Sequence, residues 1–192
     1  MLAKMYFTML PVILGGIANM IFVKTPLFRK FKKPIDLGKC TKDGKRILGD
    51  NKTWFGFLSM IVFVGIFQLG IGYVSEKCSL NHLNEFYNLH NNTMFYNFVV
   101  GFSLGFVYMI FELPNSFIKR RIDIPSGKTV SGFKGVLFFI VDQIDSLVGV
   151  MFVLYLLSDI SFGRYLAYVG VGGLTHIVIN LLLKLLKIRR NV

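Results

Sequence analysis

The sequence predicts an all-α integral membrane protein with about five transmembrane helices, and two observations lead to this fold class. First, 54% of the 192 residues are hydrophobic and the mean hydropathy is +0.59, which is too apolar for a soluble domain of this size. Second, the apolar residues gather in five runs, each long enough to cross a hydrocarbon core of about 30 Å. We therefore expect a single membrane-embedded domain over residues 1–192.

The expected spans, in chain order, are residues 1–23, 54–74, 95–113, 135–157 and 165–183. A cleaved signal peptide is the alternative for the first run, because Lys4 lies near its start and small residues lie near its end. The strongly basic sequence that follows favours a retained helix. Trp54 is placed as an interfacial anchor of the second span. Pro114 is expected to end the third span, because proline removes a backbone donor and clashes with the preceding turn.

The Lys and Arg residues are distributed unevenly between the loops, and this predicts the orientation of the chain. Residues 24–53 hold ten of them and residues 114–134 hold five, whereas residues 75–94 hold one. The tail adds Lys184, Lys187, Arg189 and Arg190, so that 19 of the 22 fall on one side. The positive-inside rule then places the amino end outside and the carboxyl end in the cytoplasm. We expect a multi-pass protein of the plasma membrane with two basic cytoplasmic loops.

The formal net charge of +12 bears on the kind of partner. A basic chain can bind nucleic acid, but in so apolar a sequence anionic lipids and anionic substrates are the expected partners, and nucleic acid is not. Cys40 and Cys78 fall on opposite sides in the predicted topology, which excludes a disulfide there. His82, His90 and His176 show no metal-ligand spacing and are interpreted as loop or helix-end residues.

Two acidic residues lie inside the fourth predicted span. Asp142 and Asp145 are three residues apart, so on a helix they share one face, about 4.5 Å apart along the axis. Each would cost about 2.5 to 3.5 kcal/mol near the centre of a membrane helix. A divalent cation such as Mg²⁺ would compensate both, since it prefers oxygen ligands, and Glu112 is a further candidate ligand. The alternatives are an ion pair with Lys128 or Lys134, or a polar joint between helices.

A basic cluster precedes the two acids in the chain. Lys119, Arg120 and Arg121 are suited to phosphate, because arginine binds phosphate oxygens through two donors and lysine acts as a point charge. A carboxylate-held metal beside such a cluster, at a membrane surface, indicates phosphoryl or nucleotidyl transfer on a lipid. The alternative is an interfacial amphipathic helix that begins at Asn115 or Ser116 and extends its basic side chains to the head groups.

The first basic loop carries a second group of candidate ligands, in the segment GKRILGDNKTWFGF at residues 44–57. The candidates for binding a triphosphate are Lys45, Arg46 and Lys52. Asp50 and Asn51 could contact metal, base or ribose, while Gly49 would let the backbone approach a ligand closely. The alternative is a basic loop that binds anionic lipid head groups, at about 1 kcal/mol per cation.

At these residues the chain resembles the CDP-archaeol synthase family, integral-membrane cytidylyltransferases related to the CDP-diacylglycerol synthases. The matching segments are GKRILGDNKTW at 44–54, SFIKRR at 116–121 and DQIDSLVG at 142–149. The resemblance implies that CTP reacts with a lipid phosphate monoester in the presence of Mg²⁺, giving a CDP-lipid and pyrophosphate in phospholipid biosynthesis. It also implies an archaeal-type ether lipid as the substrate.

Carried over by position, the resemblance implies a metal site at Asp142 and Asp145 and phosphate contacts from Lys119 and Arg120. The nucleotide or phosphate would also be bound by residues 49–53, which include Thr53, and by Asn115, Ser116 and Arg121. The chain departs from the family pattern at Glu112, where an aspartate is expected, and at Asn115, where a lysine is expected. Pro125, Ser126 and Gln143 depart from the CDP-diacylglycerol synthase pattern instead.

Several functions remain open from the sequence. Within the same chemistry, a CDP-diacylglycerol synthase would use phosphatidic acid. From other classes, a small ion or proton transporter would line its pathway with Asp142 and Asp145, and a non-catalytic scaffold would gather anionic lipids through its basic loops. Nothing in the sequence decides the oligomeric state, and a homodimer is one possible arrangement.

Overall fold

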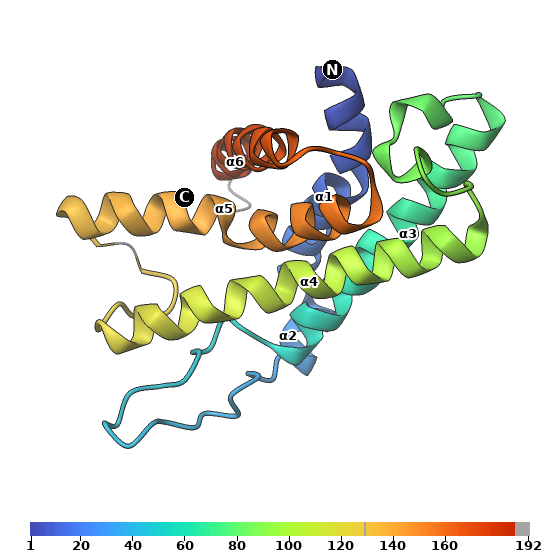
Figure 1. Cartoon of the computed structure of the whole chain (residues 1–192). Helices are drawn as coiled ribbons and strands as arrows, with labels where there is room; N and C mark the ends of the chain where they lie inside the picture. Colours follow the sequence, from blue (N-terminus) through green and yellow to red (C-terminus); the bar gives the residue numbers. More distant parts are fainter. Residues whose placement is uncertain (129, 187–192) are drawn as a thin grey trace.

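The structure is a computed structural model, and it describes residues 1–128 and 130–186. The regular secondary-structure elements in these residues are helices: α1 (Leu2–Phe22), α2 (Pro26–Phe31), α3 (Trp54–Lys77), η1 (Asn81–Leu83), η2 (Glu85–Tyr87), α4 (Met94–Arg121), α5 (Gly132–Leu157) and α6 (Phe162–Leu185) (Figure 1). Here η denotes a short 3-10 helix. α1, α3, α4, α5 and α6 are each long and apolar enough to cross a membrane.

The all-α fold with five candidate membrane spans is therefore confirmed. Each described span extends close to or beyond the predicted one; α5, for example, begins at Gly132 rather than at residue 135. The short helix α2 was not expected. The orientation of the chain across the membrane stays a prediction, and the tail residues Lys187, Arg189 and Arg190 lie outside the described residues.

The predicted end of the third span is wrong. α4 does not stop at Pro114 but continues for two further turns to Arg121. Contacts made after the proline explain this, because Asn115 donates hydrogen bonds to two side chains of α5 and Lys119 forms an ion pair with Asp142. These contacts outweigh the backbone hydrogen bond that the proline removes. Asn115 and Ser116 accordingly lie inside α4 and do not begin a separate interfacial helix.

The long helices pack in a chain of neighbours, α1 on α3, α3 on α4, α4 on α5 and α5 on α6, and α4 and α5 run side by side in Figure 1. Glycines permit two of these close approaches. A Cβ at Gly105 of α4 would lie 2.6 Å from the Cα of Ile61 in α3, and one at Gly15 of α1 would lie 3.1 Å from the Cα of Val64. A larger residue at either position would push the helices apart.

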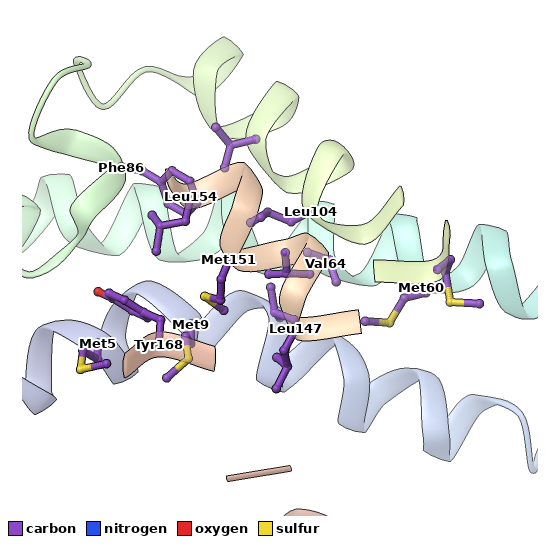
Figure 2. Close-up of a cluster of buried hydrophobic side chains, with 14 of the residues drawn as sticks. Met5, Met9, Met60, Val64, Phe86, Leu104, Leu147, Met151, Leu154 and Tyr168 are labelled. Atoms are coloured by element: carbon purple, nitrogen blue, oxygen red, sulfur yellow. The ribbon is translucent and has the colours of Figure 1, made fainter. Parts of the chain in front are cut away.

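Apolar side chains from all five long helices meet in one core (Figure 2). They include Met9 of α1, Val64 of α3, Leu104 of α4, Met151 of α5 and Tyr168 of α6, each at most 3% exposed. This core lies between two polar regions, one near the beginning of α4 and the other near its end.

The polar region near the beginning of α4 surrounds Glu85 of η2, whose side chain is fully buried. Its carboxylate accepts hydrogen bonds from Arg164, from Asn88 at 2.8 Å and from the Tyr168 hydroxyl at 3.3 Å, and it lies 3.2 Å from the ammonium of Lys4. We call these five residues the Glu85 cluster. It joins the start of α1, the 84–88 segment and the start of α6 through one carboxylate.

Candidate active site

The first basic loop is held together by Asp36, which is buried. Its carboxylate accepts a hydrogen bond from the Arg46 guanidinium at 2.7 Å and from the amides of Leu48 and Gly49 at 2.9 Å each. Burial alone would raise the pKa of the Asp36 carboxyl, but the hydrogen bonds from Arg46 and the backbone amides outweigh it and hold the pKa well below its usual range. Asp36 therefore stays ionised and fixes the course of residues 46–49.

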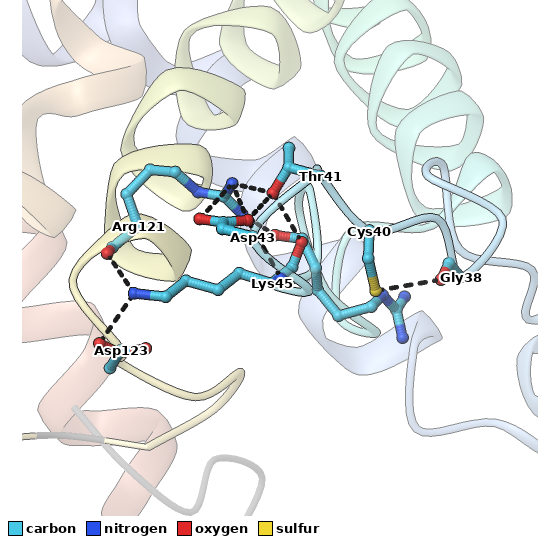
Figure 3. Close-up of polar contacts among 8 residues, drawn as sticks. Gly38, Cys40, Thr41, Asp43, Lys45, Arg121 and Asp123 are labelled. Atoms are coloured by element: carbon cyan, nitrogen blue, oxygen red, sulfur yellow. Dashed lines mark hydrogen bonds and ion pairs between the residues drawn. The ribbon is translucent and has the colours of Figure 1, made fainter.

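A second set of contacts fastens this loop to the end of α4 (Figure 3). The Arg121 guanidinium donates to Thr41, to the Asp43 carboxylate at 3.2 Å and to the backbone carbonyl of Arg46. Lys45 donates in return to the Arg121 carbonyl at 2.8 Å and to Asp123 at 2.9 Å. The basic residues Lys45, Arg46 and Arg121 are thus engaged in holding the loop against α4.

Gly49 lies where this loop touches the residues after α4. Its φ angle of +96° is in the left-handed region, and a Cβ there would collide with the Ser126 hydroxyl and lie 3.0 Å from the Arg120 guanidinium. Arg120 donates a hydrogen bond to Ser126 at the same place. The close approach predicted at Gly49 is therefore found, but it is made to two side chains of the protein.

A polar cavity of about 230 Å³ lies between the loop, α4, α5 and α6. The charged and amide side chains that line it include Asn51, Lys52, Glu112, Lys119, Asp142 and Asp145. Ser116 and Arg120 line it as well. Side chains from the two basic segments and the two acids are therefore brought to one cavity, although they come from parts of the sequence up to 94 residues apart.

The two acids of α5 are compensated by side chains of α4. The ammonium of Lys119 lies 2.5 Å from both carboxylate oxygens of Asp142. The amide nitrogen of Asn115 donates to Asp142 at 2.6 Å and to Asp145 at 2.7 Å. Glu112, one turn earlier on α4, is paired with Lys52 from the loop. The lysine beside the acids is thus Lys119, from the basic cluster, where the sequence had suggested Lys128 or Lys134.

The cavity offers oxygen ligands of the kind that a hard divalent cation prefers. Asp142 and Asp145 supply carboxylate oxygens, and the Oδ1 atom of Asn115 is a buried amide oxygen with no hydrogen-bond partner. Among the described residues, no group of three or more His, Cys, Asp or Glu side chains is placed to hold a metal ion. The set fits Mg²⁺ in donor chemistry, with two carboxylates at its centre, and the metal role of Glu112 stays a prediction.

Five predicted ligands, in addition to Gly49, lie outside the cavity lining. Lys45, Arg46 and Arg121 make the loop contacts described above, and Asp50 is paired with Arg46 at 2.8 Å. Thr53 caps α3, where its hydroxyl accepts a hydrogen bond from the Gly56 amide at 3.1 Å. A role for any of these residues in binding a nucleotide stays a prediction, and in the described geometry they position the loop.

His176 lines the cavity, and the sequence interpretation missed it. It was expected in a loop or at a helix end but lies within α6, with Nδ1 3.2 Å from the Gln143 carbonyl of α5. A signal was available in the sequence, because Gly172, His176 and Asn180 recur every four residues and so share one face of a largely apolar helix. Asn180 donates to the Gln143 side chain at 2.9 Å.

An apolar groove adjoins the polar cavity. α1, α5 and α6 line it with side chains that include Met9, Val12, Leu147 and Met151. Three residues line both the groove and the polar cavity: Met20, Tyr108 and His176. A ligand could thus place a charged head in the cavity and a hydrocarbon chain in the groove at the same time.

The sequence is similar to curated CDP-archaeol synthases from several archaea. It is 31% identical to the enzyme of Pyrococcus furiosus over 175 residues, which are 90% of this chain and 81% of that one. The enzyme of Pyrobaculum islandicum is 31% identical over 161 residues, 84% of this chain and 82% of its own. That of Archaeoglobus fulgidus is 40% identical over a shorter stretch of 111 residues, 58% of this chain and 54% of its own.

The fold is also shared with a solved structure described as an intramembrane enzyme for archaeal membrane lipids biosynthesis. The two agree with a TM-score of 0.60 over 92% of each chain, at 22% sequence identity. The family model described as CarS-like, CDP-archaeol synthase, matches residues 1–192. The family match and the curated relatives confirm the resemblance seen in the three motifs and favour an enzyme over the transporter and scaffold alternatives. The chain belongs to the CDP-archaeol synthase family, and it is a membrane-embedded cytidylyltransferase.

Proposed function

We propose that the protein transfers CMP from CTP to an archaeal-type ether lipid phosphate in the presence of Mg²⁺, giving a CDP-lipid and pyrophosphate. The observation that carries this proposal is the meeting of the polar cavity with the apolar groove at Met20, Tyr108 and His176. A nucleotide triphosphate is polar and a lipid phosphate carries long apolar chains, and a polar cavity that adjoins an apolar groove is suited to such a pair of substrates. Choice of the cytosine base and of the ether lipid rests on the family.

The reaction needs no side-chain nucleophile. An oxygen of the lipid phosphate attacks the α-phosphorus of CTP, a new P–O–P bond forms, and the bond between the α-phosphorus and the bridging oxygen breaks as pyrophosphate leaves with its electron pair. Mg²⁺, when bound, would neutralise phosphate oxygens and make the α-phosphorus more electrophilic. The remaining contribution of the protein is to position two anions in line and to neutralise charge.

The cavity residues have separate parts in this scheme. Asp142 and Asp145 hold the cation, and Lys119 and Arg120 bind phosphate oxygens on the α4 side. Lys52 and Asn51 bind the nucleotide from the loop side. Lys119 and Lys52 are each paired with an acid in the described geometry, and both residues line the cavity. Either one can therefore exchange a carboxylate for a phosphate without moving far.

The lipid lies along the groove in this proposal. Its phosphate enters the polar cavity, its glycerol unit passes between Tyr108 and His176, and its chains lie against Met9 and Met151. The basic residues of the first loop and of the end of α4 lie at the same end of the bundle as the cavity. We infer that the protein spans the plasma membrane. By the positive-inside rule, this end of the bundle then faces the cytoplasm.

The proposal is tested with purified protein in detergent. Four nucleotides labelled at the α-phosphate are each offered with an unsaturated ether lipid phosphate or with phosphatidic acid, with Mg²⁺ or with EDTA. We expect label in the lipid fraction only from CTP, only with Mg²⁺, and most strongly with the ether lipid. Equal labelling of phosphatidic acid would instead support the CDP-diacylglycerol synthase alternative. Absence of labelled lipid under every condition would contradict both.

A further inference from the structure

Asn115 lies between the two acids of the cavity, and only half of its carboxamide has partners. The side chain is 7% exposed, and its single amide nitrogen bridges Asp142 and Asp145 at 2.6 and 2.7 Å. Its carbonyl oxygen Oδ1 is buried and has no hydrogen-bond partner. A buried polar atom left without a partner costs about 1 to 3 kcal/mol, so the present arrangement leaves a defect beside a pair of carboxylates.

The two ends of a carboxamide have nearly the same shape and opposite hydrogen-bonding character. Half a turn about the Cβ–Cγ direction therefore exchanges Oδ1 and Nδ2 without disturbing the packing. With the amide nitrogen between them, the two acids receive a donor, as they need in the absence of a cation. With the oxygen there, three hard oxygen ligands would face one point, which is unfavourable by itself and favourable around a divalent cation.

We propose that Asn115 is a third ligand of the divalent cation and that its carboxamide turns over when the cation binds between Asp142 and Asp145. The proposal deepens the function proposed above and rests on it for the identity of the cation. In the form without cation, the Asn115 amide and Lys119 compensate the acids. In the loaded form, the cation does so, and the ammonium of Lys119 becomes available to phosphate.

Lys119 supplies the control that separates a ligand from a competitor. Its ammonium contacts both oxygens of Asp142, so a cation must displace it, and removal of the ammonium is expected to leave cation binding equal or tighter. If Asn115 were only a donor to the acids, its removal would act in the same direction. If Asn115 is a ligand, its removal weakens cation binding. The two interpretations thus differ in the sign of the effect.

The test is a titration of the full chain in detergent with Mn²⁺, read by the electron paramagnetic resonance signal of the free ion, with and without CTP. Loss of a contact at a metal site typically costs 10- to 100-fold in affinity, so we expect Asn115→Leu to raise the Mn²⁺ Kd by at least about tenfold. Asn115→Asp should keep or tighten binding, because it retains an oxygen and adds charge. Lys119→Met should keep or tighten it as well.

An Mn²⁺ Kd in Asn115→Leu that is unchanged or lower than that of the wild type would overturn the proposal, as would a wild-type chain that binds no Mn²⁺ in either condition. Size-exclusion profiles and unfolding temperatures check folding, and Asn115→Ala replaces the leucine variant if that one does not fold. The two proposals fail separately. If Asn115→Leu binds Mn²⁺ weakly and the wild type forms no CDP-lipid, only the proposed function fails. If the wild type forms CDP-lipid and Asn115→Leu binds Mn²⁺ normally, only the proposed ligand fails.

Discussion

Two groups of acidic side chains lie near the two ends of α4, one buried and the other partly exposed, and they differ in how completely their charges are compensated. In the Glu85 cluster, one fully buried carboxylate meets Lys4, Arg164, Asn88 and Tyr168, and both of its oxygens have partners. In the polar cavity, the acids face about 230 Å³ of open space and have exchangeable partners.

The difference distinguishes a structural cluster from a binding site. A carboxylate whose partners come from three elements of the same protein joins those elements, and a foreign ligand has no place beside it. A carboxylate that faces a cavity, and is paired only with a lysine and an amide nitrogen, can still bind a cation. Removal of the first should therefore reduce stability with little effect on chemistry, and removal of the second should do the reverse.

The largest expected effect is on activity. Asp145→Asn should lower the rate of CDP-lipid formation by at least about 100-fold, since it removes charge that the transition state needs in a site of low dielectric. The variant should still insert in the membrane, with an unfolding temperature in detergent no lower than that of the wild type. The measurement is transfer of α-labelled CMP to the ether lipid phosphate. Activity equal to the wild type would remove the metal-site assignment.

The Glu85 cluster should give the opposite result. Glu85→Gln leaves Arg164 and Lys4 without their buried partner and should cost about 2 to 3 kcal/mol of the free energy of unfolding. Thermal and denaturant unfolding in detergent measure this cost. The matched control is Asp159→Asn, which alters an exposed hydrogen bond with Asn88 and an electrostatic interaction with Lys4 but leaves the buried carboxylate in place. The CDP-lipid activity per folded molecule should be unchanged. A Glu85→Gln variant that is stable but inactive would contradict the interpretation of the Glu85 cluster as structural.

A smaller effect should separate the lipid from the nucleotide. Gly16 lines the apolar groove, and a Cβ there would meet nothing within 4 Å. Gly16→Phe should therefore fill the groove without disturbing the packing of α1. We expect the KM for the lipid phosphate to rise by about tenfold with an unchanged KM for CTP. Gly170 also has open space but lies outside the groove lining, so Gly170→Phe is the control. Equal changes in both constants would argue against a lipid in this groove.

The smallest effect concerns Asp36 and has a defined pH dependence. The pKa of Asp36 is lowered in the folded protein, so its contribution is complete above the ordinary carboxyl pKa and is lost only as the pH falls below about 4. The KM for CTP should therefore show no Asp36-dependent change between about pH 5 and pH 9. Asp36→Asn should raise this KM a few-fold throughout that range, because residues 48–52 are then less firmly placed. A variant whose effect appeared only at one end of the range would contradict this reasoning.

The sequence predicted the spans and singled out the two acids because both features depend on local chemistry. An apolar run of about 20 residues and an intramembrane carboxylate are informative wherever they occur. The contacts between distant residues were not predictable in this way. Charge identifies Arg121 as a cation, but only the fold shows that it binds Asp43 and the backbone of residue 46. Likewise, Pro114 fails to end α4 because Asn115 and Lys119 have partners on another helix.

In the proposed site, Asp142 and Asp145 hold a cation that helps to bind the nucleotide. Calorimetric titration of CTP into the detergent-solubilised protein, with Mg²⁺ or with EDTA, tests it most directly in the wild type and in the double variant Asp142→Asn/Asp145→Asn. We predict that Mg²⁺ tightens CTP binding by at least about tenfold in the wild type. In the double variant, which has lost both carboxylate ligands, Mg²⁺ should have no effect on CTP binding. A double variant whose affinity for CTP rises with Mg²⁺ as much as that of the wild type would rule out a cation held by these two acids.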